Sequence, residues 1–325
     1  MATTAPSNAV AIPAEPSRAG ATAPKIRGRG PWRLAWERLR RDRVAIGSLV
    51  VIGLIVLMAL LAPVLAAVTG HSPDEQFRKT GLSPAGLPMP PSHEFWLGTD
   101  DLGRDLAVRI AYGARISLLV GFIATALTLT IGVAVGVLAG YLGGLVDTVL
   151  ARLVDLILSI PFLLVAISLV SVIGPSLKIA IIVISLFSWA SVARIVRGQV
   201  LSIREREYIE AARSLGASDT RIMIVDVLPN VMAPVIVYAS LLIPAVIVIE
   251  ATLSFLGLGV PPPTATWGGM LNSATNYYTV AWWYILFPGL ALLITTLAFN
   301  LFGDGIRDAI DPRGEVVRRG RARGA

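Results

Sequence analysis

Six long apolar stretches, separated by short polar segments, dominate the chain. They cover approximately residues 44–68, 116–141, 153–173, 179–195, 231–256 and 280–302. A helix needs about 20 apolar residues to cross a hydrocarbon core of about 30 Å. All six stretches reach or approach that length. The first is longer than the apolar part of a cleavable signal peptide, so we expect it to be retained. The pattern predicts an all-α integral membrane protein with six transmembrane helices.

The two ends of the chain differ from this apolar body. Residues 1–30 are rich in Ala, Pro, Ser and Thr and lack apolar periodicity, which predicts a disordered tail. Residues 31–43 mix tryptophan with five arginines, which favours a basic helix lying on anionic lipid headgroups. A solvated basic linker is the alternative. Residues 303–325 are predicted to form a basic tail.

Between the first two stretches, residues 69–115 form the longest polar loop. A surface helix is expected to begin near Thr99, with Leu102, Leu106 and Ile110 along one side. The acidic pair Asp100-Asp101 suits the positive end of such a helix.

The distribution of basic residues predicts the orientation of the spans. Six spans place the second and fourth loops on the same side of the membrane as the two termini. These segments carry 22 of the 28 lysines and arginines when Arg194 is counted with the fourth loop. Positive charge concentrates in cytoplasmic segments. Both termini are therefore predicted to be cytoplasmic, in the inner or plasma membrane.

The residue types exclude several kinds of chemistry. The chain has no cysteine, and its two histidines, His71 and His93, both lie in the first loop. No lysine follows a glycine, so a phosphate-binding P-loop cannot form. We therefore expect no catalytic residue, no resident metal and no cofactor, and the net charge of +7 is spread over loops rather than gathered into a nucleic-acid surface.

A repeat of glycines inside the second stretch bears on helix packing. Gly132, Gly136 and Gly140 recur every four residues, which places three bare backbone patches on one helix face. That face could meet a partner subunit or another span of the same chain, and the sequence leaves both open.

Three prolines inside the stretches are expected to disturb their helices, and one glutamate costs free energy in the membrane. Pro161, Pro244 and Pro288 each remove a backbone donor and are expected to kink or break the helix. Glu250 is an ionisable group deep in the fifth stretch, and such groups must face protein or water. It is expected either to form a structural pair or to border a solute path.

The loop at residues 204–230 has an architecture of its own. Tyr208, Ala211, Ala212 and Leu215 share one face of a short helix, while Glu210 belongs to a charged ladder with Arg206 and Arg213 on the other.

The sequence also indicates where that short helix ends. Gly216 can adopt the left-handed conformation that ends a helix, and Ser218 or Asp219 can cap a second one. Pro229, after Leu228, is expected to stop the second helix before the fifth span. Two short helices joined by a tight turn resemble a DNA-binding helix-turn-helix, or an amphipathic linker resting on the bilayer. The close membrane spans argue against the former, and docking to a soluble partner is the favoured hypothesis.

The same residues resemble a known family. Glu210-Ala211-Ala212, then Gly216, then Leu228-Pro229 twelve residues later, resemble the EAA loop of ABC importer permeases. Asp226 stands where that family usually has an aliphatic residue.

Motifs elsewhere extend the resemblance from about Trp96 to Pro312. They are similar to segments of the dipeptide, oligopeptide and nickel permeases, and they occur at residues 98–105, 112–117, 253–259, 267–268, 300–304 and 307–308.

The resemblance implies a type I ABC importer permease (MetI-like) fold. It also implies a second permease subunit, two ATPase subunits that hydrolyse the nucleotide, and an extracytoplasmic solute-binding protein. The loop at 204–230 would be the coupling helix. The solute would be a dipeptide or oligopeptide, with nickel or another small solute as the alternative. A secondary transporter is the rival class, although one intramembrane acid and no evident repeat fit it poorly.

Overall fold

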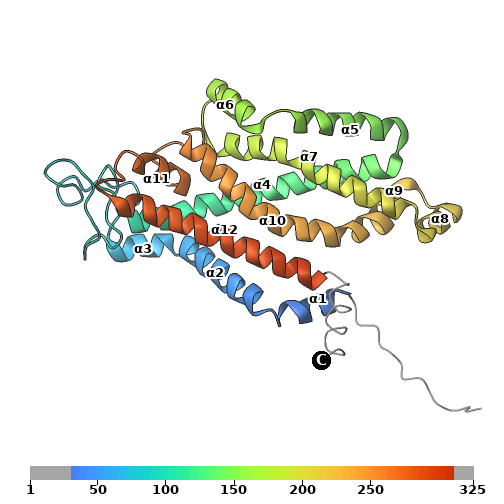
Figure 1. Cartoon of the computed structure of the whole chain (residues 1–325), viewed down its shortest axis with the longest axis horizontal. Helices are drawn as coiled ribbons and strands as arrows, with labels where there is room; N and C mark the ends of the chain where they lie inside the picture. Colours follow the sequence, from blue (N-terminus) through green and yellow to red (C-terminus); the bar gives the residue numbers. More distant parts are fainter. Residues whose placement is uncertain (1–30, 311–325) are drawn as a thin grey trace, which may run out of the picture.

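A computed structural model describes residues 31–310, and that range contains helices but no β-strand (Figure 1). The predicted tail at 1–30 and residues 311–325 lie outside the described range. The helices in chain order are α1 (Pro31–Leu39), α2 (Arg43–Leu60), α3 (Ala62–Thr69), α4 (Leu106–Leu142), α5 (Gly144–Ser159), α6 (Phe162–Ile173), α7 (Leu177–Arg204), α8 (Glu207–Ser214), α9 (Asp219–Arg221), the π-helical segment η1 (Ile222–Val227), α10 (Leu228–Phe255), α11 (Trp267–Ala274) and α12 (Trp282–Ile310).

Five of these helical segments are long and apolar enough to cross a membrane: α2, α4, α7, the continuous rod from α9 to α10, and α12. The pair α5 and α6 is a sixth candidate, bent by 83° at the break between them. The predicted all-α membrane architecture is confirmed. The break falls at Pro161, which lies between the two helices, so the expected interruption of the third stretch is also confirmed.

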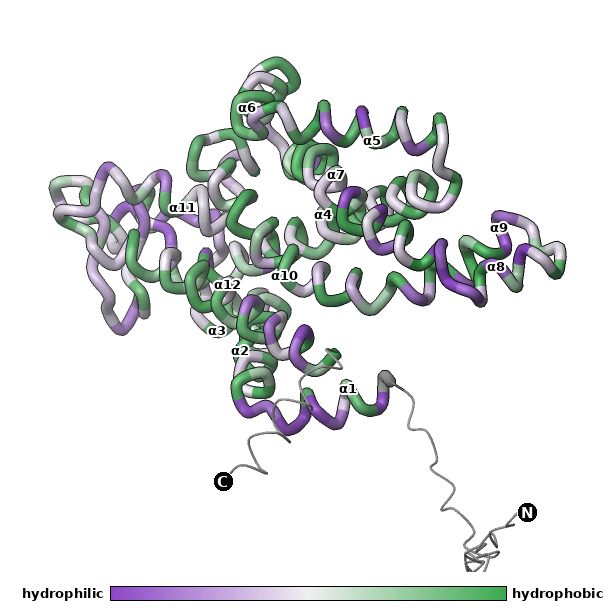
Figure 2. The backbone as a smooth tube through the Cα atoms, turned by 45° about the vertical axis from the view of Figure 1, so that its right-hand side comes forward, coloured by the Kyte–Doolittle hydropathy of each residue, from purple (hydrophilic) through white to green (hydrophobic). Residues whose placement is uncertain are grey.

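The central helices are α4 and α10, and both run the length of the molecule (Figure 1). One apolar cluster joins α4 and α10 to α7. A second cluster joins them to α2, α11 and α12 on the opposite flank. Figure 2 shows long apolar stretches along these helices, with polar residues gathered in the segment after α3, at α1 and around α8. The bundle therefore has two polar ends, called here the loop end, which carries residues 70–105, and the α8 end.

The start of α4 differs from the expectation of a surface helix near Thr99. The helix begins at Leu106, and the carboxylate of Asp105 accepts hydrogen bonds from the backbone N–H groups of Ala107 and Val108 at 2.8 and 3.3 Å. Leu106 and Ile110 are buried rather than exposed. The cap stands six residues beyond Thr99 because residues 100–104 form a separate turn, in which Asp100 accepts from the backbone N–H groups of Leu102 and Arg104 and Gly103 has a φ of +75°.

Asp100 is fully buried in an ion-pair cluster at the loop end. One of its carboxylate oxygens lies 2.6 Å from Nε of Arg104 and 3.2 Å from Nε of Arg109. The Arg109 guanidinium also donates to the carbonyl oxygen of Pro73 at 2.8 Å. Since a buried charge needs such compensation, this cluster fixes residues 70–105 onto the first turns of α4.

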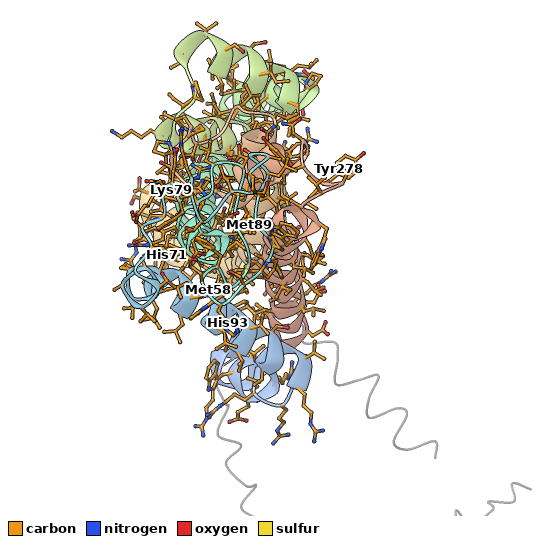
Figure 3. All side chains as sticks on the ribbon, turned by 90° about the vertical axis from the view of Figure 1, so that its left-hand side faces the viewer. Met58, His71, Lys79, Met89, His93 and Tyr278 are labelled. Atoms are coloured by element: carbon orange, nitrogen blue, oxygen red, sulfur yellow. The ribbon has the colours of Figure 1, made fainter. Side chains whose placement is uncertain are left out.

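Further side chains tie the loop end to α12. The Tyr284 hydroxyl donates to Asp101 at 2.9 Å, and His71 Nδ1 lies 2.7 Å from the Asp105 carboxylate. In Figure 3, His71, Lys79, Met89 and His93 all lie over this end of the bundle, while Tyr278 projects from its edge. The predicted long loop is therefore a folded segment that covers this end of the bundle.

The C-terminal boundary also needs correction. Residues 303–310 continue α12 as a helix, whereas the sequence predicted a tail from 303 onward. At this point a Cβ added to Gly305 would lie 2.5 Å from the Cβ of Ala45, so α12 passes close to the start of α2. Helix α1 covers part of residues 31–43 and packs against the same end of α12.

The most extensive contact between spans is a seam between α4 and α7. Cβ atoms added to Gly132, Gly136 and Gly140 would lie 2.5 to 2.7 Å from the Cβ atoms of three valines of α7, namely Val192, Val196 and Val200. Real Cβ atoms do not approach so closely. The glycine face therefore meets another span of the same chain, and this resolves the choice that the sequence left open.

The seam predicts opposite effects for two glycine substitutions. Gly136→Ala places a methyl group 2.7 Å from Val196 and 2.8 Å from the carbonyl oxygen of Ala193, so we expect the free energy of unfolding to fall by about 1–3 kcal/mol. Gly198→Ala on α7 meets no atom within 4 Å and should be neutral or stabilising, since alanine favours helix. Thermal unfolding of the purified protein in detergent compares the two, and equal midpoints would contradict the close seam.

Candidate functional site

The short helix α8 projects from the α8 end on a loop between two long helices (Figure 1). Its contact with the bundle is made by Ile209, which is completely buried in the apolar cluster of α4, α7 and α10. Ala212, three residues later, is half-buried against the same cluster. These two residues form the inner face of α8.

The outer face of α8 is apolar and open. Tyr208 is 43% exposed and Leu215 is 88% exposed, and Ala211 between them is exposed as well. These three residues share one face because they are spaced by three and four positions. The four-residue face predicted from sequence is thus divided, with Ala212 turned toward the bundle and the other three free to contact a partner.

The charged ladder predicted along α8 does not form ion pairs. Within the described residues, no ion pair of 4 Å or less joins the Glu210 carboxylate to the guanidinium of Arg206 or Arg213. The guanidinium of Arg213 instead lies 5.8 Å from the ring centroid of Tyr141, at the end of α4. A hydrogen bond to the Tyr141 hydroxyl raises the pKa of Arg213. Tyr141 in turn donates to Asp219 at 2.9 Å, so one tyrosine holds both sides of the α8 loop.

Gly216 ends α8 as predicted. Its φ is +81°, and its N–H donates to the carbonyl oxygen of Arg213 at 3.0 Å. The N–H of Ala217 reaches back to the carbonyl oxygen of Ala212 at 3.1 Å, completing a Schellman turn. The next helix is capped by Ser218, one of the two candidates that the sequence offered.

The predicted stop at Pro229 is wrong. The helix from Asp219 continues through η1 into α10 as one rod, and Pro229 stands in the first turn of α10. The wider π-helical turn gives the proline ring room, and the side-chain amide Nδ2 of Asn230 donates to the backbone carbonyl oxygen of Asp226 at 2.6 Å. Leu228 is half-buried against the central cluster. The loop therefore contains one free helix, α8, and the extension of α10.

Glu250 lies inside α10 with no exposed surface. Its carboxylate accepts one hydrogen bond from Ser117 of α4 at 3.0 Å and another from Ser254 at 2.7 Å. Its partners are hydroxyl groups of the protein core rather than a charged side chain. This placement favours a structural tie between α4 and α10 over a position bordering a solute path.

Pro244 and Pro288 do not break their helices, although kinks or breaks were expected. Each is buried within a continuous helix, α10 or α12. Neighbouring helices and side chains can satisfy the backbone groups that an intramembrane proline frees. Among the three prolines, only Pro161 separates two helices, and its ring is exposed.

Comparison with known proteins adds a family to this geometry. Residues 132–315 match the model for the binding-protein-dependent transport system inner membrane component, and residues 30–85 match the N-terminal transmembrane domain of oligopeptide transport permease C. The first match covers more than half of the chain. The chain belongs to this family. It is thus a permease component of an ABC importer, and the secondary-transporter hypothesis is set aside.

Several curated relatives of this permease span nearly its full length. A di/tripeptide transport system permease of Pseudomonas aeruginosa is 42% identical over 91% of this chain and 96% of its own. An oligopeptide transport system permease of Escherichia coli is 42% identical over 89% of this chain and 93% of its own. A dipeptide transport system permease of Bacillus subtilis is 41% identical over 86% of this chain and 85% of its own.

The fold of the permease also resembles a solved structure. An inward-facing structure of the MetNI methionine ABC transporter aligns with a TM-score of 0.53 at 20% identity, over 62% of this chain and 96% of that chain. At this identity the likeness supports the fold alone, and it confirms the MetI-like architecture expected from the sequence.

Some residues that position the site were not identified from the sequence. The sequence did not single out Ile209 because the apolar spacing from Tyr208 to Leu215 indicated the adjacent face of α8. The valines opposite the glycine seam recur every four residues, and that repeat would have identified α7 as the partner of α4. The tie from Tyr141 to Asp219 joins residues 78 positions apart, and no local pattern indicates it.

Two substitutions of Glu250 separate its possible roles. Glu250→Gln keeps a side chain that can bond both serines, so we expect normal membrane levels and normal uptake. Glu250→Ala leaves the hydroxyls of Ser117 and Ser254 without that partner and should lower the free energy of unfolding by about 1–3 kcal/mol. Thermal unfolding and uptake are measured for both. Loss of uptake in a stable Glu250→Gln protein would contradict the structural role.

Proposed function

We propose that this permease forms, with a second permease subunit, the membrane path of an ATP-driven importer for dipeptides and oligopeptides. The proposal is supported by relatives at 41–42% identity whose names state peptide transport and which the chain matches over most of its length. A solute-binding protein outside the membrane would deliver the peptide, and two ATPase subunits would hydrolyse the nucleotide.

The observation that carries this proposal is the open apolar face of α8. Tyr208, Ala211 and Leu215 stand outward on a helix whose inner residue, Ile209, is fully buried. An anchored helix with a free apolar face suits docking into a groove of a soluble partner. Closure of the ATPase subunits would then move α8 and, through Tyr141 and Ile209, the ends of α4 and α10.

Orientation follows from the same arrangement. Helices α1 and α8 and the end of α12 lie at the same end of the bundle (Figure 1), and most basic residues belong to that end. We assign this end to the cytoplasm by the positive-inside rule. Helix α1 would rest on anionic headgroups there, since Trp36 is 54% exposed and the Arg40 guanidinium lies 5.6 Å from its ring centroid. The loop end would face the binding protein.

Substitutions on the two faces of α8 test the docking role. Leu215→Ser and Ala211→Arg alter only the outer face, so the protein should fold and insert normally, while peptide uptake and peptide-stimulated ATP hydrolysis fall about tenfold or more. The measurement uses the complete transporter reconstituted with its binding protein.

A matched control is Leu145→Ser, which changes a leucine of α5 that is 79% exposed but lies outside α8. It should leave uptake near the wild-type rate. Wild-type uptake by Leu215→Ser and Ala211→Arg at normal membrane levels would reject docking through α8. A wild-type transporter that carries no peptide would reject the proposed solute instead.

A further inference from the structure

A cavity at the loop end is not used by the docking function of α8. Its volume is about 320 Å³, and its lining includes Asp74, Tyr112, Arg115, Ile116, Leu119 and Ala265. These residues come from three separate segments: the chain after α3, the first turns of α4, and the loop between α10 and α11. The volume lies within the range of small-molecule sites, which is about 300–1,000 Å³.

The cavity contains an arginine with no carboxylate partner. Arg115 is exposed, and its guanidinium lies 5.6 Å from the ring centroid of Tyr112. Within residues 31–310 no acidic side chain forms an ion pair with Arg115 within 4 Å, whereas Arg104 and Arg109 at the same end each have two acidic partners. Stacking on the tyrosine positions the guanidinium while its N–H groups stay available for an anion.

A carboxylate also lines the cavity. Asp74 is 49% exposed, and one of its oxygens lies 3.4 Å from Nη1 of Arg109. Arg109 is itself held by the buried Asp100, so its charge is shared between two acids. Asp74 therefore keeps the capacity to attract a cation.

The remaining wall is apolar. Ile116 and Leu119 follow Arg115 on α4, and Ala265 faces the same cavity from the loop after α10. Leu119 is 40% exposed. A ligand that suits the cavity carries a carboxylate, a nearby ammonium group and an apolar portion, and a short peptide with free termini has all three.

We propose that this cavity is a receiving site for the peptide, in which Arg115 binds the C-terminal carboxylate and Asp74 attracts the N-terminal ammonium group. Ile116 and Leu119 contact a side chain of the peptide. An arginine can make two parallel hydrogen bonds to one carboxylate, so the Arg115 guanidinium suits this role. The inference rests on the proposed peptide import, and it adds a solute contact on this subunit.

The first test is protection of a single cysteine. The chain has no cysteine, so Leu119→Cys is unique in this subunit. The complete transporter carrying it is reconstituted in phosphatidylcholine nanodiscs with its binding protein and treated with a water-soluble maleimide. Tri-alanine should slow the labelling at least threefold, and adding Arg115→Gln should abolish that protection.

Two outcomes of the labelling would overturn the proposal. Equal labelling with and without tri-alanine would mean that the peptide does not enter the cavity. A cysteine that resists labelling under every condition would mean that the second permease subunit or lipid covers it. Repeating the experiment with phosphatidylglycerol separates the two anion sources, because protection by this lipid without peptide would assign Arg115 to lipid headgroups and reject the peptide site.

The second test is uptake of tri-alanine at a saturating concentration of loaded binding protein. Arg115→Gln should lower the rate about tenfold, as expected for the loss of a charge-assisted hydrogen bond, and Arg115→Lys should restore part of it. ATP hydrolysis without peptide should not change. The control is Arg78→Gln, an exposed arginine at the same end that, within residues 31–310, bonds only Gln76.

The outcomes of the uptake test distinguish the two proposals. If the wild-type transporter carries no peptide, the proposed function fails. If it carries tri-alanine and Arg115→Gln carries it equally well, only the receiving site fails.

Discussion

The seam of glycines between α4 and α7 is the contact on which the site depends. Close approach along Gly132, Gly136 and Gly140 fixes the line along which α7 leaves the bundle, and α8 begins three residues after α7 ends. At the end of the seam, the carbonyl oxygen of Gly140 accepts a hydrogen bond at 3.4 Å from the side chain of Arg204, which is the last residue of α7. Packing inside the bundle therefore sets the position of the exposed helix.

The two polar ends are joined by helices that belong to both apolar clusters. Helix α4 is 37 residues long, about 55 Å at 1.5 Å per residue, so it reaches from the Asp105 cap to Tyr141 beneath α8. Helix α10 lies beside it, and Glu250 bonds the two together near the loop end. A displacement of α8 would thus act directly on α4 and on the rod from α9 to α10, each 37 residues long, which is the mechanical arrangement that the proposed coupling requires.

Sequence patterns predicted the elements that depend on composition and local geometry, and they failed where distant residues meet. The apolar stretches gave the spans because lipid demands long apolar helices, and Gly216 marked its turn because few other residues adopt positive φ. Pro229 misled because a π-helical turn accommodates a proline that an α-helix would exclude. The start of α4 was misplaced because the chain turns at Gly103, where φ is +75°, and the carboxylate of Asp100 pairs with Arg104 and with Arg109, nine residues further on. Such pairings are set by tertiary structure.

The π-helical segment between α9 and α10 carries a consequence for insertions and deletions. A π-turn holds about one residue more than an α-turn, and each residue of an α-helix turns the chain by about 100°. Five residues of α-helix therefore turn the chain about as far as the six residues of Ile222–Val227 do, so loss of one residue here would let the segment rewind as regular α-helix with little rotation of what precedes it. Rewinding the six residues as α-helix without a change in length would instead rotate α8 by roughly 100° about the axis of α10, so the π-helical segment itself sets the direction of the outer face.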